Sequence, residues 1–124
     1  MRVLLSLLLL LTAPAVWPAG DFERETFYSN QHCAAWGGAP TALPSGIRPD
    51  CETRFAVVEF DWAKRPKVYE CIGQAIAYAE ETGKTPVCAM LARTPDELDY
   101  AERMEGTVKR AGVVPVIIIL YPAR

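Results

Sequence analysis

The second half of the sequence alternates apolar strand-like runs with amphipathic helical runs, and this alternation restricts the fold more than any other feature. Apolar side chains recur at helical spacing from Val68 to Ala79, which predicts a long helix over residues 67 to 82. A capping box at residues 94 to 97 begins a second helix that ends near Ala111. Strands are predicted before, between and after these helices, at residues 55 to 61, 87 to 92 and 114 to 121. Strands joined by helical crossovers form right-handed βαβ units, so the pattern predicts an α/β fold.

The first half of the chain adds one helix and two weaker strands. Asp21 can cap a helix that runs to Trp36, and strands are expected at residues 40 to 43 and 47 to 54, the second with Pro49 at an edge or a bulge. The predicted order is therefore α-β-β-β-α-β-α-β, a mixed central sheet with helices on both faces. The last strand is apolar at every position from 116 to 120, which favours a central place with both faces buried.

Residues 1 to 19 differ from the rest in composition. Arg2 precedes an aliphatic run over residues 3 to 11, and small residues and prolines follow, which is the layout of a secretory signal peptide. The run is shorter than the roughly 20 residues of a membrane span, so no stable span is expected after signal removal. We expect cleavage near residues 13 to 15 or after Ala19, a single domain over residues 20 to 124, and a periplasmic or secreted protein. The alternative is a retained N-terminal anchor or a buried helix.

The cysteines and the charge agree with export and limit the partners. Four cysteines allow three pairings, and the predicted layout favours Cys33–Cys51, between the first helix and the strand that it covers, and Cys71–Cys88, between neighbouring helix and strand. The alternative is four reduced, buried thiols. The net charge of −2 argues against tight nucleic-acid binding over the whole surface, although a local basic patch remains open.

The residues with most chemical content lie between positions 50 and 67. Asp50 ends a Pro-Asp step, and Glu59 and Asp61 lie on one face of the strand that follows. Carboxylates from adjacent strands can converge on a hard cation such as Mg²⁺ or Mn²⁺, which activates water and neutralises charge at a phosphate. Three cations come next in the sequence: Lys64, Arg65 and Lys67. The stretch therefore predicts a metal-dependent phosphodiesterase site in which Lys64 folds back toward the phosphate.

The element order and these motifs resemble the PD-(D/E)XK, or restriction-endonuclease-like, nuclease superfamily. Pro49-Asp50 and the Glu59-containing strand resemble its two acidic motifs, and the residues from Gly46 to Asp50 and from Gln74 to Tyr78 resemble the glycine–aspartate and Q-x-x-x-Y motifs of its RecB-like branch. Residues 58 to 84 are also similar to a group of small bacterial proteins of that fold.

The resemblance implies a role for each matching residue. Asp50 and Glu59 would be the metal ligands, with Asp61 beside them, and Glu25 would match an acid that some members carry on the first helix. Gln74 and Tyr78 would line the substrate groove. The predicted contacts to a nucleic-acid substrate also include the two cations next to Lys64, namely Arg65 and Lys67.

One departure from the family pattern keeps a second function open. The family carries lysine two residues after the second acid, and Asp61 occupies that position here. The first hypothesis is an exported nuclease or other phosphodiesterase; the second is a non-catalytic binding or assembly module on the same fold. For individual residues, purely structural roles also remain open as alternatives. The acids can pair with Arg48 or Arg54, the three cations can form a solvated loop, and Gln74 and Tyr78 can border the core.

Overall fold

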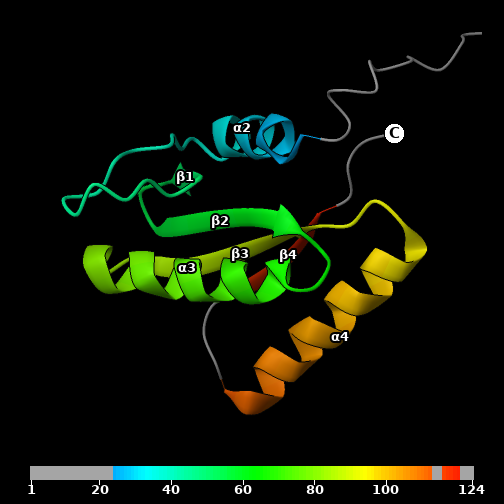
Figure 1. Ribbon diagram of the computed structural model, residues 1–124. Helices are drawn as coiled ribbons and strands as arrows, with labels where there is room; N and C mark the ends of the chain where they lie inside the picture. Colours follow the sequence, from blue (N-terminus) through cyan, green and yellow to red (C-terminus); the bar gives the residue numbers. More distant parts are fainter. Residues whose placement is uncertain (1–23, 113–115, 121–124) are drawn as a thin grey trace, which may run out of the picture.

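The computed structural model describes residues 24–112 and 116–120, and they form an α/β fold (Figure 1). The amphipathic runs in the second half of the sequence give the two longest helices, with the capping Thr94 accepting a hydrogen bond from the Glu97 backbone N–H as the capping box predicts. The elements in chain order are α2 (Glu25–Ala35), β1 (Cys51–Glu52), β2 (Ala56–Trp62), α3 (Lys67–Thr82), β3 (Thr85–Leu91), α4 (Pro95–Ala111) and β4 (Val116–Leu120).

The four strands form one mixed sheet in the order β1-β2-β3-β4. The short β1 is antiparallel to β2, with Cys51 opposite Val58. The other strands are parallel, with Val58 opposite Val87 and Val87 opposite Val116. The mixed sheet predicted from the sequence is therefore confirmed, and its two parallel connections are the helices α3 and α4.

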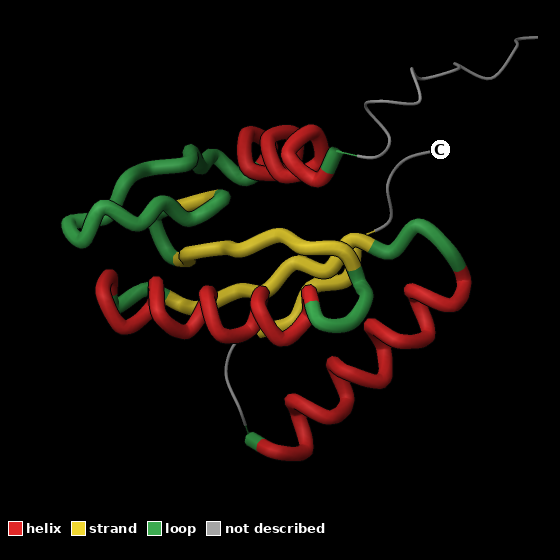
Figure 2. The backbone as a smooth tube through the Cα atoms, in the orientation of Figure 1, coloured by secondary structure: helices red, strands yellow, loops and turns green. Residues whose placement is uncertain are grey.

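Helices cover both faces of the sheet, as predicted (Figures 1 and 2). On β2, Phe60 and Trp62 face α2 and belong to the same apolar cluster as Tyr28 of that helix. The intervening residues face α3, where Val57 packs against Tyr78. Both crossovers lead to the next strand in the same direction, so α3 and α4 lie on the same face. The face shared with α3 is therefore the one that receives the acidic residues of β2.

The early strands are shorter than the sequence predicts. The expected strand at residues 40 to 43 is wrong: only an isolated bridge pairs Ala39 with Glu52. The expected strand at 47 to 54 is reduced to the two residues of β1. Pro49 has no N–H for a ladder, and at the next position the Asp50 side chain, rather than its backbone carbonyl, accepts the Phe60 N–H of β2. As a result, β2 continues past the end of its partner strand.

Two further elements differ from the prediction: the first helix begins at another residue, and β4 has another position in the sheet. The predicted cap Asp21 lies outside the described residues; α2 begins at Glu25, and Arg24 in the N-cap position forms no side-chain cap hydrogen bond. Among the described strands, β4 lies at the sheet edge rather than at the centre. Each crossover places its strand outside the previous one, so β3, rather than β4, has a neighbouring strand on each side. An apolar run in a sequence indicates a strand with two covered faces, but it does not indicate whether a strand pairs with it on each side.

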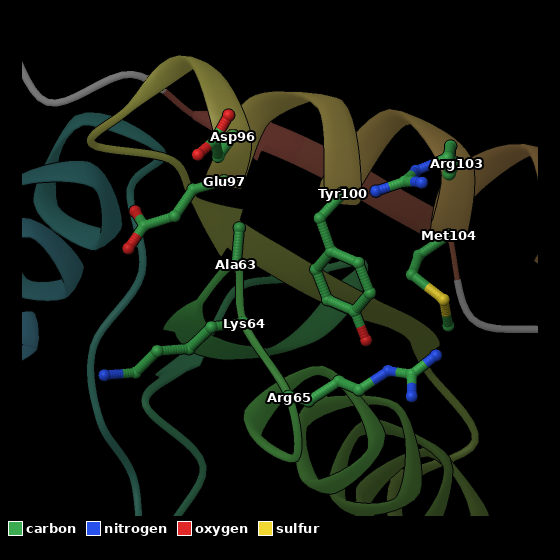
Figure 3. A pocket seen from close by; sticks show the side chains of 8 residues that line it. All are labelled: Ala63, Lys64, Arg65, Asp96, Glu97, Tyr100, Arg103 and Met104. Carbon is green, nitrogen blue, oxygen red and sulfur yellow. The ribbon is translucent and has the colours of Figure 1, made fainter.

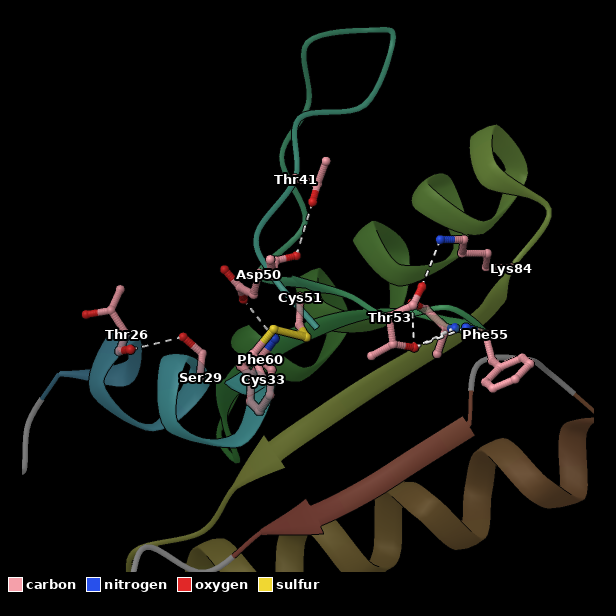
Figure 4. The surroundings of a disulfide bond; sticks show 12 residues. Thr26, Ser29, Cys33, Thr41, Asp50, Cys51, Thr53, Phe55, Phe60 and Lys84 are labelled. Carbon is pink, nitrogen blue, oxygen red and sulfur yellow. Dashed lines mark hydrogen bonds between the residues drawn. A yellow bond between two sulfur atoms is a disulfide. The ribbon is translucent and has the colours of Figure 1, made fainter. Parts of the chain in front are cut away.

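Two disulfides join the same cysteines that the sequence layout favours. Cys33–Cys51 ties α2 to β1, with Cα atoms 5.5 Å apart, and Cys71–Cys88 ties α3 to β3, with Cα atoms 5.6 Å apart (the first is shown in Figure 4). Gly38 lies against the first bridge, because a Cβ there would be 2.6 Å from the Cys51 sulfur. A side chain at this position would push α2 away from β1.

The described helices include none that is long and apolar enough to cross a membrane. The predicted signal peptide, residues 1 to 19, lies outside the described residues and stays a prediction.

Candidate functional site

The unpaired edge of β2 is closed by carboxylates instead of a strand. Past Val58, alternate N–H groups of β2 point toward the side where β1 has ended. The Phe60 N–H donates to Asp50 Oδ2 at 2.8 Å (Figure 4), and the Trp62 N–H donates to Asp61 Oδ1 at 3.1 Å. Two of the predicted metal-site acids therefore also satisfy backbone donors, which is a structural role that the sequence does not reveal.

Glu59 and Asp61 lie on the α3 face of β2 and are almost fully buried. Their residues are 8% and 4% exposed, respectively, values that few acidic residues show without a cationic partner. Glu59 Oε2 is buried and has no hydrogen-bond partner among the described residues. The Tyr78 hydroxyl of α3 contacts the same carboxylate, and this contact favours its charged form. The Asp50 backbone N–H also contacts this carboxylate, so Glu59 is held by two donors and left unsatisfied at Oε2.

Four carboxyl groups interact at this edge, which we call the carboxylate cluster: Glu25, Asp50, Glu59 and Asp61. Burial and then the charge of Asp61 raise the pKa of Glu25 to about 8, and the two side chains also share a hydrogen-bonding contact. Burial and then the charge of Asp50 raise the pKa of Glu59 to about 8. Burial likewise raises the pKa of Asp50 and Asp61 above the ordinary value. Near neutral pH the cluster therefore retains protons, or it requires a cation in their place.

Among the described residues, Lys67 rather than Lys64 is the cation whose charge acts on Asp61 of the cluster. Lys67 begins α3, and its charge lowers the pKa of Asp61 against the effect of burial. It also pairs with Glu70 at 3.0 Å, and this contact and the charge of Asp61 raise its own pKa. Lys64 lines a separate cavity together with Arg65, and there its charge acts on Glu97 (Figure 3). The catalytic role predicted for Lys64 stays a prediction, but the structure puts Lys67 in the better position for it.

The helix face predicted to line a substrate groove runs beside the cluster. Tyr78 contacts Glu59, and Glu70, two turns earlier on the same face of α3, acts on Asp61. Gln74 lies between them on the same line of α3 and is exposed, so its amide is accessible next to the acids. Tyr78 itself is 4% exposed, and burial together with the Glu59 charge raises its pKa. Tyr78 therefore positions Glu59, whereas Gln74 remains accessible to a substrate.

Sequence reasoning from local pattern did not place Glu25 in the site. The only signal was its position in the first turn of a helix, which the resemblance to nucleases connected with a family acid. The residue reaches Asp61 because α2 lies across the sheet with its amino-terminal end toward the carboxyl end of β2 (Figure 1). This approach depends on how the disulfide-linked helix is docked, and no spacing in the sequence encodes it.

The donor set of the cluster suits a hard divalent cation. Carboxylate oxygens are the ligands that Mg²⁺ and Mn²⁺ prefer, and Mg²⁺ usually takes only one or two of them together with water and substrate oxygens. Within residues 24–112 and 116–120, no group of three or more His, Cys, Asp or Glu side chains is placed so that it could hold a metal ion. The buried, unpartnered Glu59 oxygen beside Asp50 and Asp61 nevertheless fits an ion that is bound by few protein ligands.

Comparisons with known proteins identify no related protein. No protein-family model matches the chain, and no curated protein or solved structure is significantly similar to it. The nuclease-like resemblance therefore rests on the sequence motifs and on an element order that the described residues match only in part.

Proposed function

We propose that the protein is an exported, metal-dependent phosphodiesterase of the PD-(D/E)XK type, acting on nucleic acid. The observation that supports this function best is the buried Glu59 oxygen without a partner, inside a group of four carboxyls that repel one another. An uncompensated carboxylate group of this kind costs stability, and a divalent cation relieves that cost. Asp50 and Glu59, with Asp61 beside them, would hold Mg²⁺ or Mn²⁺.

The residues around the cluster would divide the remaining work. A bound divalent ion would supply charge neutralisation at the phosphate and a more acidic bound water. Tyr78 holds the Glu59 carboxylate in place, and Glu25 can accept or hold a proton beside Asp61. Lys67 would place its ammonium group near the substrate phosphate, and the exposed Gln74 would contact the substrate backbone. In this arrangement, Lys67 carries the role that the family pattern gives to lysine.

The test combines metal binding with hydrolysis. Calorimetric titration is expected to show that the protein binds Mn²⁺. Assays on single- and double-stranded DNA and RNA are expected to show hydrolysis that depends on the metal ion. Glu59→Gln is expected to reduce it by about a hundredfold or more, in the range seen when a metal ligand or its support is removed. Glu105→Gln, which changes a half-buried acid on α4, serves as the charge-matched control. Hydrolysis that is absent, or equal in wild type and Glu59→Gln, would rule this function out.

A second function is favoured by the hydrogen bonds of two cluster acids. Asp50 and Asp61 satisfy the Phe60 and Trp62 N–H groups, so part of the cluster serves to close the sheet edge. A non-catalytic binding or assembly module would use the same edge for a partner. Metal binding without hydrolysis of any nucleic acid would favour this alternative.

The proposed location follows from the predicted signal peptide and the two disulfides. Two disulfides persist in oxidising compartments and are rare in the cytosol. Together with the predicted signal peptide, they support a periplasmic or secreted protein.

A further inference from the structure

A cavity of about 520 Å³ lies between the loop after β2 and the first half of α4 (Figure 3). The loop contributes Ala63, Lys64 and Arg65, and α4 contributes Tyr100, Arg103 and Met104. This cavity contains none of the four acids of the carboxylate cluster. A ligand in this cavity would therefore bind apart from the proposed phosphodiesterase site.

The charges at one end of the cavity are positive and poorly compensated. Among the described residues, no carboxylate forms an ion pair with Arg65. Arg103 pairs only with Asp99 on its own helix, at 3.2 Å, and both side chains are about two-thirds exposed. An exposed pair of this kind is weak and can be replaced by a ligand. Figure 3 shows Arg65 near the hydroxyl end of the Tyr100 side chain and Arg103 near its attachment to α4, so both arginines border the Tyr100 end of the cavity.

The acids of the cavity lie at its other end. Asp96 and Glu97 belong to the first turn of α4, and in Figure 3 they stand away from Arg65. Glu97 is already occupied, because its carboxylate accepts hydrogen bonds from the Arg93 backbone N–H and guanidinium, each at 2.8 Å. The end of the cavity near Tyr100 therefore favours an anion.

A buried donor without a partner points into this positive end. The Tyr100 hydroxyl is buried and forms no hydrogen bond in the described structure, and it is directed toward Arg65 (Figure 3). Burial raises the pKa of Tyr100, and the Arg65 guanidinium and Tyr69 hydroxyl lie close enough to affect it, yet neither meets hydrogen-bond geometry with the oxygen. Buried hydroxyl groups normally have a partner. An oxyanion between Tyr100 and the two arginines would supply it.

We propose that this cavity binds a phosphate monoester that carries an aromatic or other apolar substituent. Arg65 and Arg103 hold the phosphate, since guanidinium forks match its oxygens and two of them match a dianion. The Tyr100 hydroxyl donates a third hydrogen bond. The apolar substituent packs against Ala63 and Met104, which provide the apolar part of the wall. The site is a second ligand site and does not depend on the phosphodiesterase activity.

The test is a titration of the full protein with phenyl phosphate in the presence of a chelator, followed by calorimetry or by NMR shifts of the ligand. Phenyl phosphate is expected to bind more tightly than either benzoate or inorganic phosphate. Equal binding of benzoate would overturn the phosphate assignment, and equal binding of inorganic phosphate would overturn the apolar subsite. No binding of phenyl phosphate at millimolar concentration would overturn the site as a whole.

Variants then identify the residues that bind. Arg65→Gln is expected to weaken phenyl phosphate binding by about tenfold or more, and Tyr100→Phe by about threefold to tenfold. Asp99→Asn is expected to tighten it, because Arg103 loses its competing partner. Arg110→Gln changes the same charge on α4 outside the cavity and is expected to leave binding unchanged. Thermal unfolding verifies that each variant folds. Unchanged affinity in folded Arg65→Gln and Tyr100→Phe would contradict the assignment.

Discussion

The acids of α4 and the acids of the carboxylate cluster occupy opposite electrostatic situations in one small molecule. On α4, Glu97, Asp99 and Glu105 each pair with a cation one helical turn away, at 2.8 to 3.2 Å. At the edge of β2, Glu59 and Asp61 are more deeply buried and lie next to other carboxyls, and among the described residues neither forms an ion pair. Spacing along a helix provides partners for the first group, whereas the second group has none within its own element.

This difference in electrostatic environment separates acids that stabilise the fold from acids that destabilise it. A paired acid on a helix surface contributes modestly and predictably. A buried acid among like charges lowers stability, and such groups are concentrated at functional sites. The comparison therefore favours the β2 edge, rather than the more numerous charges of α4, as the candidate functional site.

The largest expected effect is a dependence of stability on pH that originates in Glu59. Its pKa in the folded protein is about 8, above the ordinary value of 4.5, so the folded state holds the proton more tightly than the unfolded state does. The contribution to the free energy of unfolding is complete below about pH 4.5 and is lost as the pH rises through 8. Allowing for residual solvent contact, we expect a loss of about 2–4 kcal/mol from this group between pH 5 and pH 9, measured by urea denaturation.

The variant Glu59→Gln removes the charge and keeps the shape. At pH 9 it is expected to be more stable than wild type by a similar amount, and its stability is expected to change less between the two pH values. Added Mn²⁺ at high pH is expected to stabilise wild type and not the variant. The control Glu105→Gln, on the paired helix, is expected to follow the wild-type profile. A wild-type profile that is flat from pH 5 to pH 9 would remove the contrast between the two groups of acids.

The sequence was informative where structure is periodic or local. The apolar spacing from Val68 to Ala79 predicts α3, and the capping box at Thr94 predicts the start of α4. Alternation along β2 places Glu59 and Asp61 on one face, as found. The disulfide pairs followed from the order of helices and strands.

The sequence was uninformative where the outcome depends on tertiary partners. The length of β1 depends on Asp50 using its side chain where a strand would use its backbone. The edge place of β4 depends on the direction of the crossovers. In the site, the approach of Glu25 depends on how α2 docks, and the choice between Lys64 and Lys67 depends on the course of the loop after β2. None of these is a property of residues close together in sequence.

An intermediate effect is expected at Asp50, which shares features of both groups. It belongs to the cluster, but its Oδ2 accepts the Phe60 N–H at 2.8 Å. Asp50→Ala leaves that donor unpaired, whereas Asp50→Asn keeps an oxygen in place and removes only the charge. Denaturation at pH 7 is expected to show Asp50→Ala less stable than Asp50→Asn by about 1–2 kcal/mol. Equal stability of the two variants would mean that the hydrogen bond does not close the sheet edge.

The smallest effect is expected at Glu97, and its pH dependence has the opposite sign. Burial alone would raise the pKa of Glu97, but the hydrogen bonds and the charge of Arg93 outweigh it and lower the pKa below the ordinary value. The folded state therefore binds the proton less tightly than the unfolded state does. Its contribution to stability is complete above the unfolded-state pKa and is lost as the pH falls through the folded-state pKa.

The variant Glu97→Gln tests this reversed sign directly. At pH 7 the loss is expected to be about 0.5–1 kcal/mol, because the glutamine oxygen retains part of the contact with Arg93. Once the pH falls below the folded-state pKa, so that wild-type Glu97 is itself protonated, the difference in unfolding free energy is expected to disappear. Arg93 also stacks on Trp62, 3.9 Å from the ring centroid, and this contact remains in the variant. A difference that grew toward low pH would place Glu97 with the repelling acids of the β2 edge, and the division between the two groups would no longer hold.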